Sequence, residues 1–252
     1  MSRDSLSRIK AVLVVGYCED LTKQKIDEAK EIASYLQSLG VHVSEFYPPN
    51  DKWQHIVRAS VDANIFLYSG HGTTMGEQGK VGGLCLSKEV FISSDSIYKE
   101  LKLHKNALVL FQSVCYAAGS SASDNSDIGA KVALQRVSDY AHPFVKLGVA
   151  GYYANDYLNT SKQFLKEFLN KKNIEQIYVA ATSSYCQIQL TKKYIYNTNF
   201  EVSVASPKNI SGFATRTSYV NGKPKIEKIP VFKEYEVAYV GIPTFTVLDF
   251  FK

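Results

Sequence analysis

IFLYSGHG, at residues 65–72, is an apolar run that ends in a turn carrying His71. A second stretch, ALVLFQSVC at residues 107–115, is built in the same way and ends on Cys115. Continuous apolar runs bounded by turn signals are typical of strands buried on both faces of a parallel sheet. Because ligands bind beyond the carboxyl ends of such strands, we expect His71 and Cys115 to meet at one crevice.

Small, flexible residues follow both strand ends, at residues 72–76 and 116–123. They would let a substrate backbone come close to the protein backbone. A single cysteine at a strand end is usually a packing residue, and a single His-Gly is usually a turn. The two matching stretches together favour a catalytic pair, in which a thiolate is the nucleophile and an imidazole moves the proton.

The rest of the chain alternates between strand-like and helix-like patterns. Strands are expected at 10–17, at 41–47 near the sheet edge and at 148–153, and a small hairpin within 79–94 is a candidate wall of the cleft. Helices are expected at 22–39, 53–60, 94–101, 127–147 with an interruption at Pro143, 160–169 with a cap near Asn159 or Thr160, and 174–194. Such alternation predicts an α/β fold, a three-layer αβα sandwich with a mainly parallel, doubly wound sheet.

The last fifty residues have a different character. The segments 202–205, 212–220, 225–231 and 238–247 are β-prone, and Asn221-Gly222 is a two-residue hairpin signal. We expect a β-rich segment at about 200–252 that packs on a core formed by about 10–195. With no linker in its 252 residues, the chain is expected to form a single domain over 1–252.

Composition excludes several classes of function. The net charge of +5 comes from 29 basic and 24 acidic residues without a clustered basic face, so no nucleic-acid partner is indicated. No apolar run is long enough to span a membrane, so no membrane partner is indicated either. The first residues lack the apolar core of a signal peptide, which favours the cytoplasm and leaves a mature secreted form open. Nothing in the pattern indicates an oligomeric state.

The four cysteines are far apart in the chain and form no C-x-x-C pair. Neither a zinc site nor a redox dithiol is therefore predicted, and we assign no metal and no cofactor. Cys18, Cys85 and Cys186 lie in apolar or helical contexts and are interpreted as structural thiols.

The two motif strands resemble the caspase-like cysteine peptidases, a group that includes caspases, metacaspases, gingipains, clostripain-like enzymes and CHAT-domain proteins. The resemblance lies in FLYSGHG at 66–72, LVLFQSVC at 108–115 and FVKLGVAG at 144–151, and it extends over about residues 10–190. It implies a caspase-like fold and a cysteine endopeptidase acting on a protein or peptide substrate. By the same resemblance Cys115 is the nucleophile, His71 is its proton-transfer partner, and the backbone amides of Gly72 and Cys115 form the oxyanion hole.

Two positions depart from the pattern of that family. Val114 stands where many members have Ala or Ser, and Ser113 stands where clostripain-like enzymes and metacaspases carry an Asp. A preference for basic P1 residues therefore does not transfer. Other acidic residues remain candidates for such a pocket, although capping is their commoner role: Asp95, Asp124, Asp127 and Asp156.

Three further hypotheses remain at this point. Self-processing, if it occurs, is expected in the loop 119–127 or between Asn197 and Asn209. A non-catalytic caspase-like module that binds a partner protein or peptide is the main alternative function. A nucleotide-binding sheet is disfavoured, because no G-x-G-x-x-G follows the first strand, where GYCED stands at 16–20.

Overall fold

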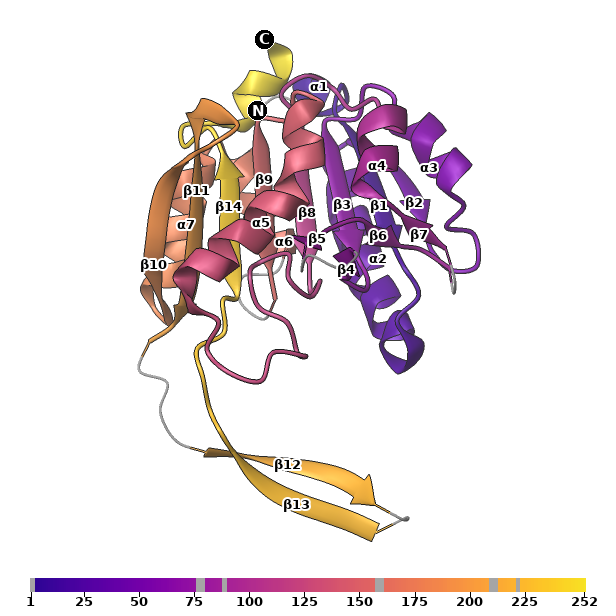
Figure 1. Ribbon diagram of the computed structural model, residues 1–252. Helices are drawn as coiled ribbons and strands as arrows, with labels where there is room; N and C mark the ends of the chain where they lie inside the picture. Colours follow the sequence, from indigo (N-terminus) through magenta and orange to yellow (C-terminus); the bar gives the residue numbers. More distant parts are fainter. Residues whose placement is uncertain (1–2, 76–79, 88–89, 157–160, 209–212, 221–222) are drawn as a thin grey trace.

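The computed structural model describes residues 3–75, 80–87, 90–156, 161–208, 213–220 and 223–252, and eight of its strands form one central sheet (Figure 1). Five of them run parallel, in the order β2, β1, β3, β8, β9. Three more extend the sheet beyond β9 as antiparallel neighbours, in the order β14, β11, β10. The parallel strands are β1 (Lys10–Val15), β2 (His42–Phe46), β3 (Ile65–Ser69), β8 (Leu108–Gln112) and β9 (Gly151–Asn155), and the antiparallel ones are β14 (Val237–Gly241), β11 (Asn197–Pro207) and β10 (Cys186–Tyr194).

Helices cover both faces of this sheet. The buried side chains of α2 (Thr22–Ser38), α6 (Ser161–Leu169) and α7 (Ile174–Ser183) belong to one apolar cluster. Those of α3 (Trp53–Ala59), α4 (Ser94–Glu100) and α5 (Gly129–Lys146) belong to a second cluster on the other face. The predicted α/β fold with three layers and a mainly parallel, doubly wound sheet is therefore confirmed. A short helix, α1 (Arg3–Leu6), precedes the sheet.

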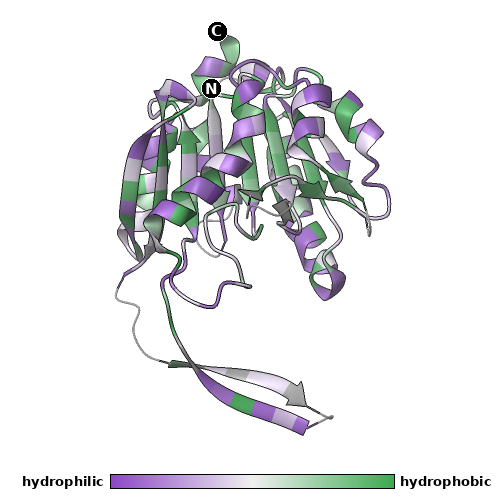
Figure 2. Ribbon diagram, viewed as in Figure 1, coloured by the Kyte–Doolittle hydropathy of each residue, from purple (hydrophilic) through white to green (hydrophobic). Residues whose placement is uncertain are grey.

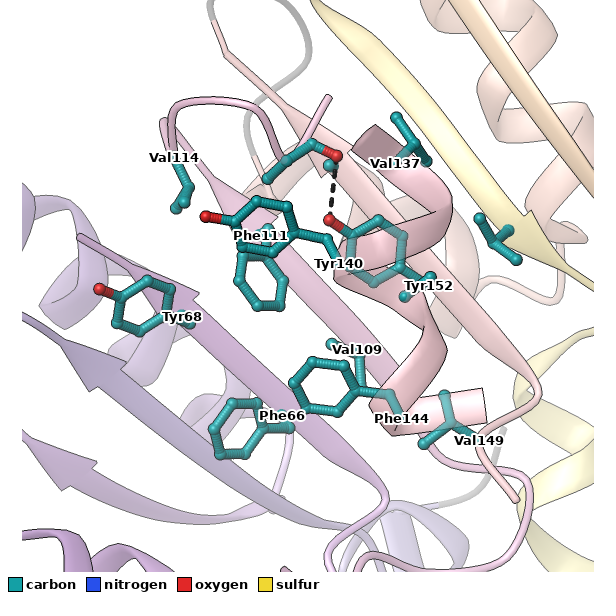
Figure 3. Close-up of a cluster of buried hydrophobic side chains, with 14 of the residues drawn as sticks. Phe66, Tyr68, Val109, Phe111, Val114, Val137, Tyr140, Phe144, Val149 and Tyr152 are labelled. Carbon is teal, nitrogen blue, oxygen red and sulfur yellow. Dashed lines mark hydrogen bonds between the residues drawn. The ribbon is translucent and has the colours of Figure 1, made fainter. Parts of the chain in front are cut away.

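The parallel strands are buried because both of their faces are covered by helices. Every residue of β3, β8 and β9 is buried, and Figure 2 shows the hydrophobic colouring concentrated in the central strands. On the α5 side an aromatic cluster surrounds Phe111, whose ring contacts the rings of Tyr68, Tyr140, Phe144 and Tyr152 (Figure 3). This cluster lies directly beneath the ends of β3 and β8.

Two small antiparallel pairs follow β3. β4 (Thr74–Met75) pairs with β5 (Lys80–Val81), and β6 (Leu84–Cys85) pairs with β7 (Phe91–Ile92). The predicted hairpin within 79–94 is therefore present as β6 and β7. The hydroxyl of Tyr68, at the end of β3, lies 2.8 Å from the Cys85 carbonyl and accepts a hydrogen bond of 3.0 Å from the Cys85 amide, so this hairpin is fastened beside His71.

Two of the helix predictions are wrong in part. The segment 174–194 is helical only to Ser183, and its second half is the edge strand β10. Antiparallel pairing with β11 supplies the hydrogen bonds that make this half a strand. Helix α5 is not interrupted at Pro143, which lies buried inside it. The predicted cap at Asn159 or Thr160 falls outside the described residues.

The C-terminal segment divides between the sheet and a separate ribbon. β11 and β14 are adjacent strands of the central sheet, and between them the chain forms β12 (Phe213–Val220) and β13 (Lys223–Pro230). β12 pairs with β13 in the register expected for a two-residue connection, although residues 221–222 themselves lie outside the described part. Figure 1 shows this ribbon standing away from the body, so it does not pack on the core as expected. β14 packs against α7, and the 3-10 turn at Val247–Phe251 adds buried side chains to the same apolar cluster.

No helix in the described residues combines the length and apolar character required to cross a membrane.

Replacing Phe111 with Ala should lower the free energy of unfolding by about 3–5 kcal/mol, because the substitution leaves a cavity at the centre of the aromatic cluster. Urea unfolding followed by circular dichroism measures the change. Ile195→Ala is the control, since Ile195 is largely exposed and should change the free energy by less than about 0.5 kcal/mol. Equal effects of the two substitutions would show that Phe111 is not central to the core.

Candidate active site

The parallel pairing of β3 with β8 brings the two motif turns together. Tyr68 is opposite Phe111 in this pairing, so His71 comes three residues beyond the paired position and Cys115 comes four residues beyond it. The turns are in direct backbone contact, because a Cβ atom added to Gly72 would collide with the carbonyl of Cys115. The same Cβ atom would lie 2.9 Å from the Tyr140 hydroxyl. Only a glycine therefore fits this position.

Cys115 lies on a sharp turn of the backbone. Ser113 and Tyr116 on either side of it have positive φ angles of 51° and 68°, which are uncommon for residues with a side chain. Several hydrogen bonds hold this conformation. The Ser113 amide donates to the Asn155 carbonyl at 2.8 Å, and the Tyr116 amide donates to the Ser120 carbonyl at 2.6 Å. Strain of this kind is concentrated at functional sites, where the surrounding structure compensates for it.

A buried lysine supports the same turn from below. Lys25, on α2, donates hydrogen bonds to the carbonyl of Ser113 at 2.7 Å and to the hydroxyl of Ser69 at 3.3 Å. Ser69 is the last residue of β3 and Ser113 follows β8, so one ammonium group links the ends of both motif strands. Lys25 was not predicted from the sequence, where it is one of several polar residues in an amphipathic helix.

The imidazole of His71 is exposed and has an acidic partner. Its Nε2 atom lies 2.7 Å from Oε2 of Glu19, and the two side chains are 50% and 64% exposed. Glu19 follows β1, whose two neighbours β2 and β3 lie on opposite sides, so the pair spans the point where the strand order reverses. That point is where doubly wound sheets bind ligands. The only sequence signal for Glu19 was its place after a central strand.

Backbone donors are present beside Cys115. Among the described residues, neither the amide of Gly72 nor that of Cys115 donates a hydrogen bond to a backbone acceptor. The neighbouring amide of Thr73 is different, because it donates to the Tyr140 hydroxyl at 3.0 Å. An oxyanion hole needs two such donors directed at one point, and these two amides lie on turns that are in contact.

The bulk of Val114 is explained by its burial. Val114 is only 1% exposed and belongs to the same apolar cluster as Phe111 and Tyr140 (Figure 3). Its side chain therefore points into the core, whereas the next residue, Cys115, is partly exposed. A valine at this position anchors the turn and does not obstruct it.

Of the four candidate aspartates, Asp156 is the one that forms a hydrogen bond with the Ser113–Tyr116 turn in the described residues. Asp124 is engaged by Arg136 in two hydrogen bonds of 2.8 Å each, and Asp127 accepts from the amide of Gly129. Asp95 is an exposed residue of α4. Asp156 directly follows β9, and its carbonyl accepts a hydrogen bond of 3.0 Å from the Ser113 hydroxyl.

Asp156 and Glu236 form an acidic pair beside the turn, and Glu236 is buried while Asp156 is partly exposed. Burial raises the pKa of Asp156 to about 8, and the nearby Lys25 opposes this rise while Glu236 and Glu234 add to it. Burial likewise raises the pKa of Glu236 to about 7. The Asp156 amide donates to the Glu236 carbonyl at 2.8 Å, which joins the two residues. Raised carboxyl pKa values next to a crevice are typical of functional sites.

The other three cysteines are poor nucleophiles. Burial raises the pKa of Cys18 to about 11 and that of Cys186 to about 12, and it also raises the pKa of Cys85. Each is therefore a protonated thiol at neutral pH, which agrees with their interpretation as structural residues. Within the described ranges, no group of three His, Cys, Asp or Glu side chains is arranged to hold a metal ion.

The Asp156 carboxyl should make the protein less stable as pH rises. Its pKa in the folded state, about 8, exceeds the ordinary value of 3.8, so the folded state holds a proton that the unfolded state releases between these values. Stability from this group is complete below about pH 4 and is lost as pH rises through about 8. Asp156→Asn should therefore stabilise the protein by at least about 1 kcal/mol at pH 8.5 and have little effect at pH 4. Urea unfolding at the two pH values tests this, and an equal effect at both would contradict it.

No protein-family model matches the chain, and no curated protein matches it. Function is therefore inferred from the geometry and chemistry of the site.

Proposed function

We propose that this protein is a cysteine endopeptidase that hydrolyses peptide bonds through Cys115 and His71. The observation that carries the proposal is the contact between the two motif turns, in which the backbone of Gly72 lies against the carbonyl of Cys115. It places a partly exposed thiol and an exposed imidazole on adjacent turns at the carboxyl edge of the parallel strands. The caspase-like fold and the caspase-like ancestry implied by the two motifs belong to the same proposal.

The reaction needs a nucleophile, a proton-transfer group and two hydrogen-bond donors for the oxyanion, and the site has candidates for all four. The Cys115 thiolate attacks the scissile carbonyl carbon and forms a tetrahedral intermediate, whose oxyanion accepts hydrogen bonds from the amides of Gly72 and Cys115. His71 gives a proton to the leaving amine as the carbon–nitrogen bond breaks, which leaves an acyl-enzyme. A water molecule then attacks the thioester, loses a proton to His71, and releases the acid and the thiol.

Glu19 is proposed as the residue that positions His71. A carboxylate 2.7 Å from one ring nitrogen fixes the rotation of the imidazole and balances the positive charge that it gains during proton transfer. The other ring nitrogen is then directed away from Glu19 and is available to the thiol. Glu19 has a positive φ angle of 42°, so the backbone holds it in an unusual conformation at this position.

Replacing Cys115 with Ala should abolish cleavage of a peptide library, with kcat/KM reduced at least about 1000-fold, because no other group can form the acyl-enzyme. A peptidyl chloromethyl ketone should label the wild-type protein on Cys115 alone, as the thiolate displaces chloride. Peptide mapping by mass spectrometry locates the label, and Cys186→Ala is the control that should keep both activity and labelling. A library cleaved equally by Cys115→Ala would contradict the role of Cys115. An unlabelled Cys115 in a wild-type protein that cleaves nothing would favour a non-catalytic module that binds a partner protein or peptide.

Glu19→Gln should reduce kcat about 10-fold or more while KM changes little, since the carboxylate orients the imidazole and does not bind the substrate. Steady-state kinetics on the best library peptide separates the two constants. Asp20→Asn is the matched control, because Asp20 is the next residue, is exposed and carries the same charge. A similar loss of kcat in both variants would show that the negative charge of the loop matters and that the contact of Glu19 with His71 does not.

A further inference from the structure

Three tyrosines of the aromatic cluster bring hydroxyl groups to the backbone of the two motif turns. Tyr68, Tyr140 and Tyr152 surround Phe111, and each is no more than 1% exposed (Figure 3). Burying a hydroxyl group among apolar side chains is unfavourable unless a hydrogen bond replaces its lost contact with water. A phenylalanine would fill nearly the same volume without that cost, so the three oxygen atoms are explained by the groups that they bind.

Two of these hydroxyls hold the turn after β3. The hydroxyl of Tyr68, which also binds the β6–β7 hairpin, donates to the carbonyl of His71 at 3.1 Å. The hydroxyl of Tyr140, on α5, accepts from the amide of Thr73 at 3.0 Å. The His71 carbonyl and the Thr73 amide belong to the two peptide units on either side of Gly72. Both of these units are therefore held from the core side.

The planarity of the peptide bond converts this contact into a direction for the Gly72 amide. In a trans peptide unit the carbonyl and the amide point in opposite directions. Pro48-Pro49 is the one cis peptide bond among the described residues, so the unit between His71 and Gly72 is trans. Because its carbonyl is directed at the buried hydroxyl of Tyr68, its amide is directed away from the core. This agrees with the absence of a backbone acceptor for the Gly72 amide in the described part of the chain.

The third hydroxyl holds the turn after β8. Tyr152, on β9, donates to the carbonyl of Ala117 at 2.9 Å. The amide of Ala117 in turn donates to the carbonyl of Val114 at 3.1 Å, which closes the turn around Cys115. The Val114 carbonyl and the Cys115 amide belong to one trans peptide unit, so the Cys115 amide points away from Ala117. Tyr152 therefore acts on the direction of this amide through Ala117.

We propose that Tyr68, Tyr140 and Tyr152 are positioning residues that direct the amides of Gly72 and Cys115 at one oxyanion. The hydroxyls lie in the core and act through the backbone of the turns, without contact to the substrate. Donors that are fixed before the reaction need no reorganisation when negative charge develops on the substrate oxygen. This inference rests on the proposed peptidase function, because it concerns the hydrogen bonds that the tetrahedral intermediate receives.

Three substitutions, Tyr68→Phe, Tyr140→Phe and Tyr152→Phe, each remove one oxygen atom and keep the ring. Each should lower kcat at least about 10-fold and change KM less than about 2-fold, since the amides bind the transition state more strongly than the substrate. Tyr194→Phe is the matched control, because Tyr194 is buried in the same apolar cluster and binds a carbonyl of α5 outside both turns, at 3.4 Å. An unchanged kcat in the three variants, or an equal loss in Tyr194→Phe, would overturn the proposal.

Two reagents separate the oxyanion hole from the thiol. The Cys115 thiolate adds to the carbon of a peptide aldehyde, and the electron pair of the carbon–oxygen double bond moves to the oxygen, which occupies the oxyanion position while the thiol proton stays on His71. Iodoacetamide instead alkylates the sulfur by displacing iodide and forms no oxyanion.

In each of the three variants the Ki of the aldehyde should rise at least about 10-fold, whereas the rate of alkylation of Cys115 should stay within about 2-fold of the wild type. Peptide mapping by mass spectrometry assigns the alkylation to Cys115. An equal effect on both reagents would show that the hydroxyls support the thiol and would overturn their assignment to the oxyanion hole. Circular dichroism of each variant verifies that the sheet is intact.

Deuterium exchange of the backbone amides separates this proposal from the peptidase function, because it needs no substrate. The peptide that covers the turn contacted by the altered tyrosine, at 70–75 or 113–119, should exchange at least about 10-fold faster than in the wild type, and Tyr194→Phe should exchange like the wild type. Unchanged exchange would overturn the positioning proposal whether or not the wild type is active. If exchange is faster but the wild type cleaves no peptide, the peptidase proposal fails and the hold of the three hydroxyls on the turns stands.

Discussion

The contact between the turn after β3 and the turn after β8 is the constraint on which the candidate site depends. Parallel strands that are neighbours in the sheet bring their carboxyl ends to one edge, and here they do so with Tyr68 and Phe111 in register. Gly72 then comes so close to the carbonyl of Cys115 that no side chain fits between them. The aromatic cluster around Phe111 fixes the strands from below, and Lys25 joins their ends through Ser69 and Ser113. Removal of any of these supports would alter the relation between the imidazole and the thiol.

Charge around the site is distributed unevenly. Glu19 and His71 lie at the surface, where water screens their interaction, while Lys25 and Glu236 are buried and Asp156 is partly exposed. Burial raises the pKa of Asp156 to about 8 and that of Glu236 to about 7, so at neutral pH the two acids carry less than two full negative charges beside Lys25.

Much of the fold could be predicted from the sequence because its main signals are local. The buried runs at β1, β3 and β8, the helix at α2 and the Asn-Gly connection each have a pattern that needs no distant partner. Strand β10 was missed because its half-exposed surface and short apolar alternation resemble a helix end, and only pairing with β11 makes it a strand. Glu19 and Lys25 were missed for the same reason, since their roles arise from residues more than forty positions away in the sequence. His71 and Cys115 were predicted to lie close together because each follows a buried strand, and buried strands are the elements that the sequence indicates most clearly.

The pairing of β11 with β14 also determines where the length of the chain can change without disturbing the sheet. The chain leaves the sheet after Pro207 and returns at Val237, and these strands are hydrogen-bonded neighbours with Ala205 opposite Val237. In the topology of the sheet, the segment between Pro207 and Val237 is therefore one long hairpin connection. The entropic cost of closing such a loop grows only slowly with its length. The segment between β11 and β14 can therefore be lengthened, shortened or exchanged while the sheet that carries the two motif turns keeps its strand pairing.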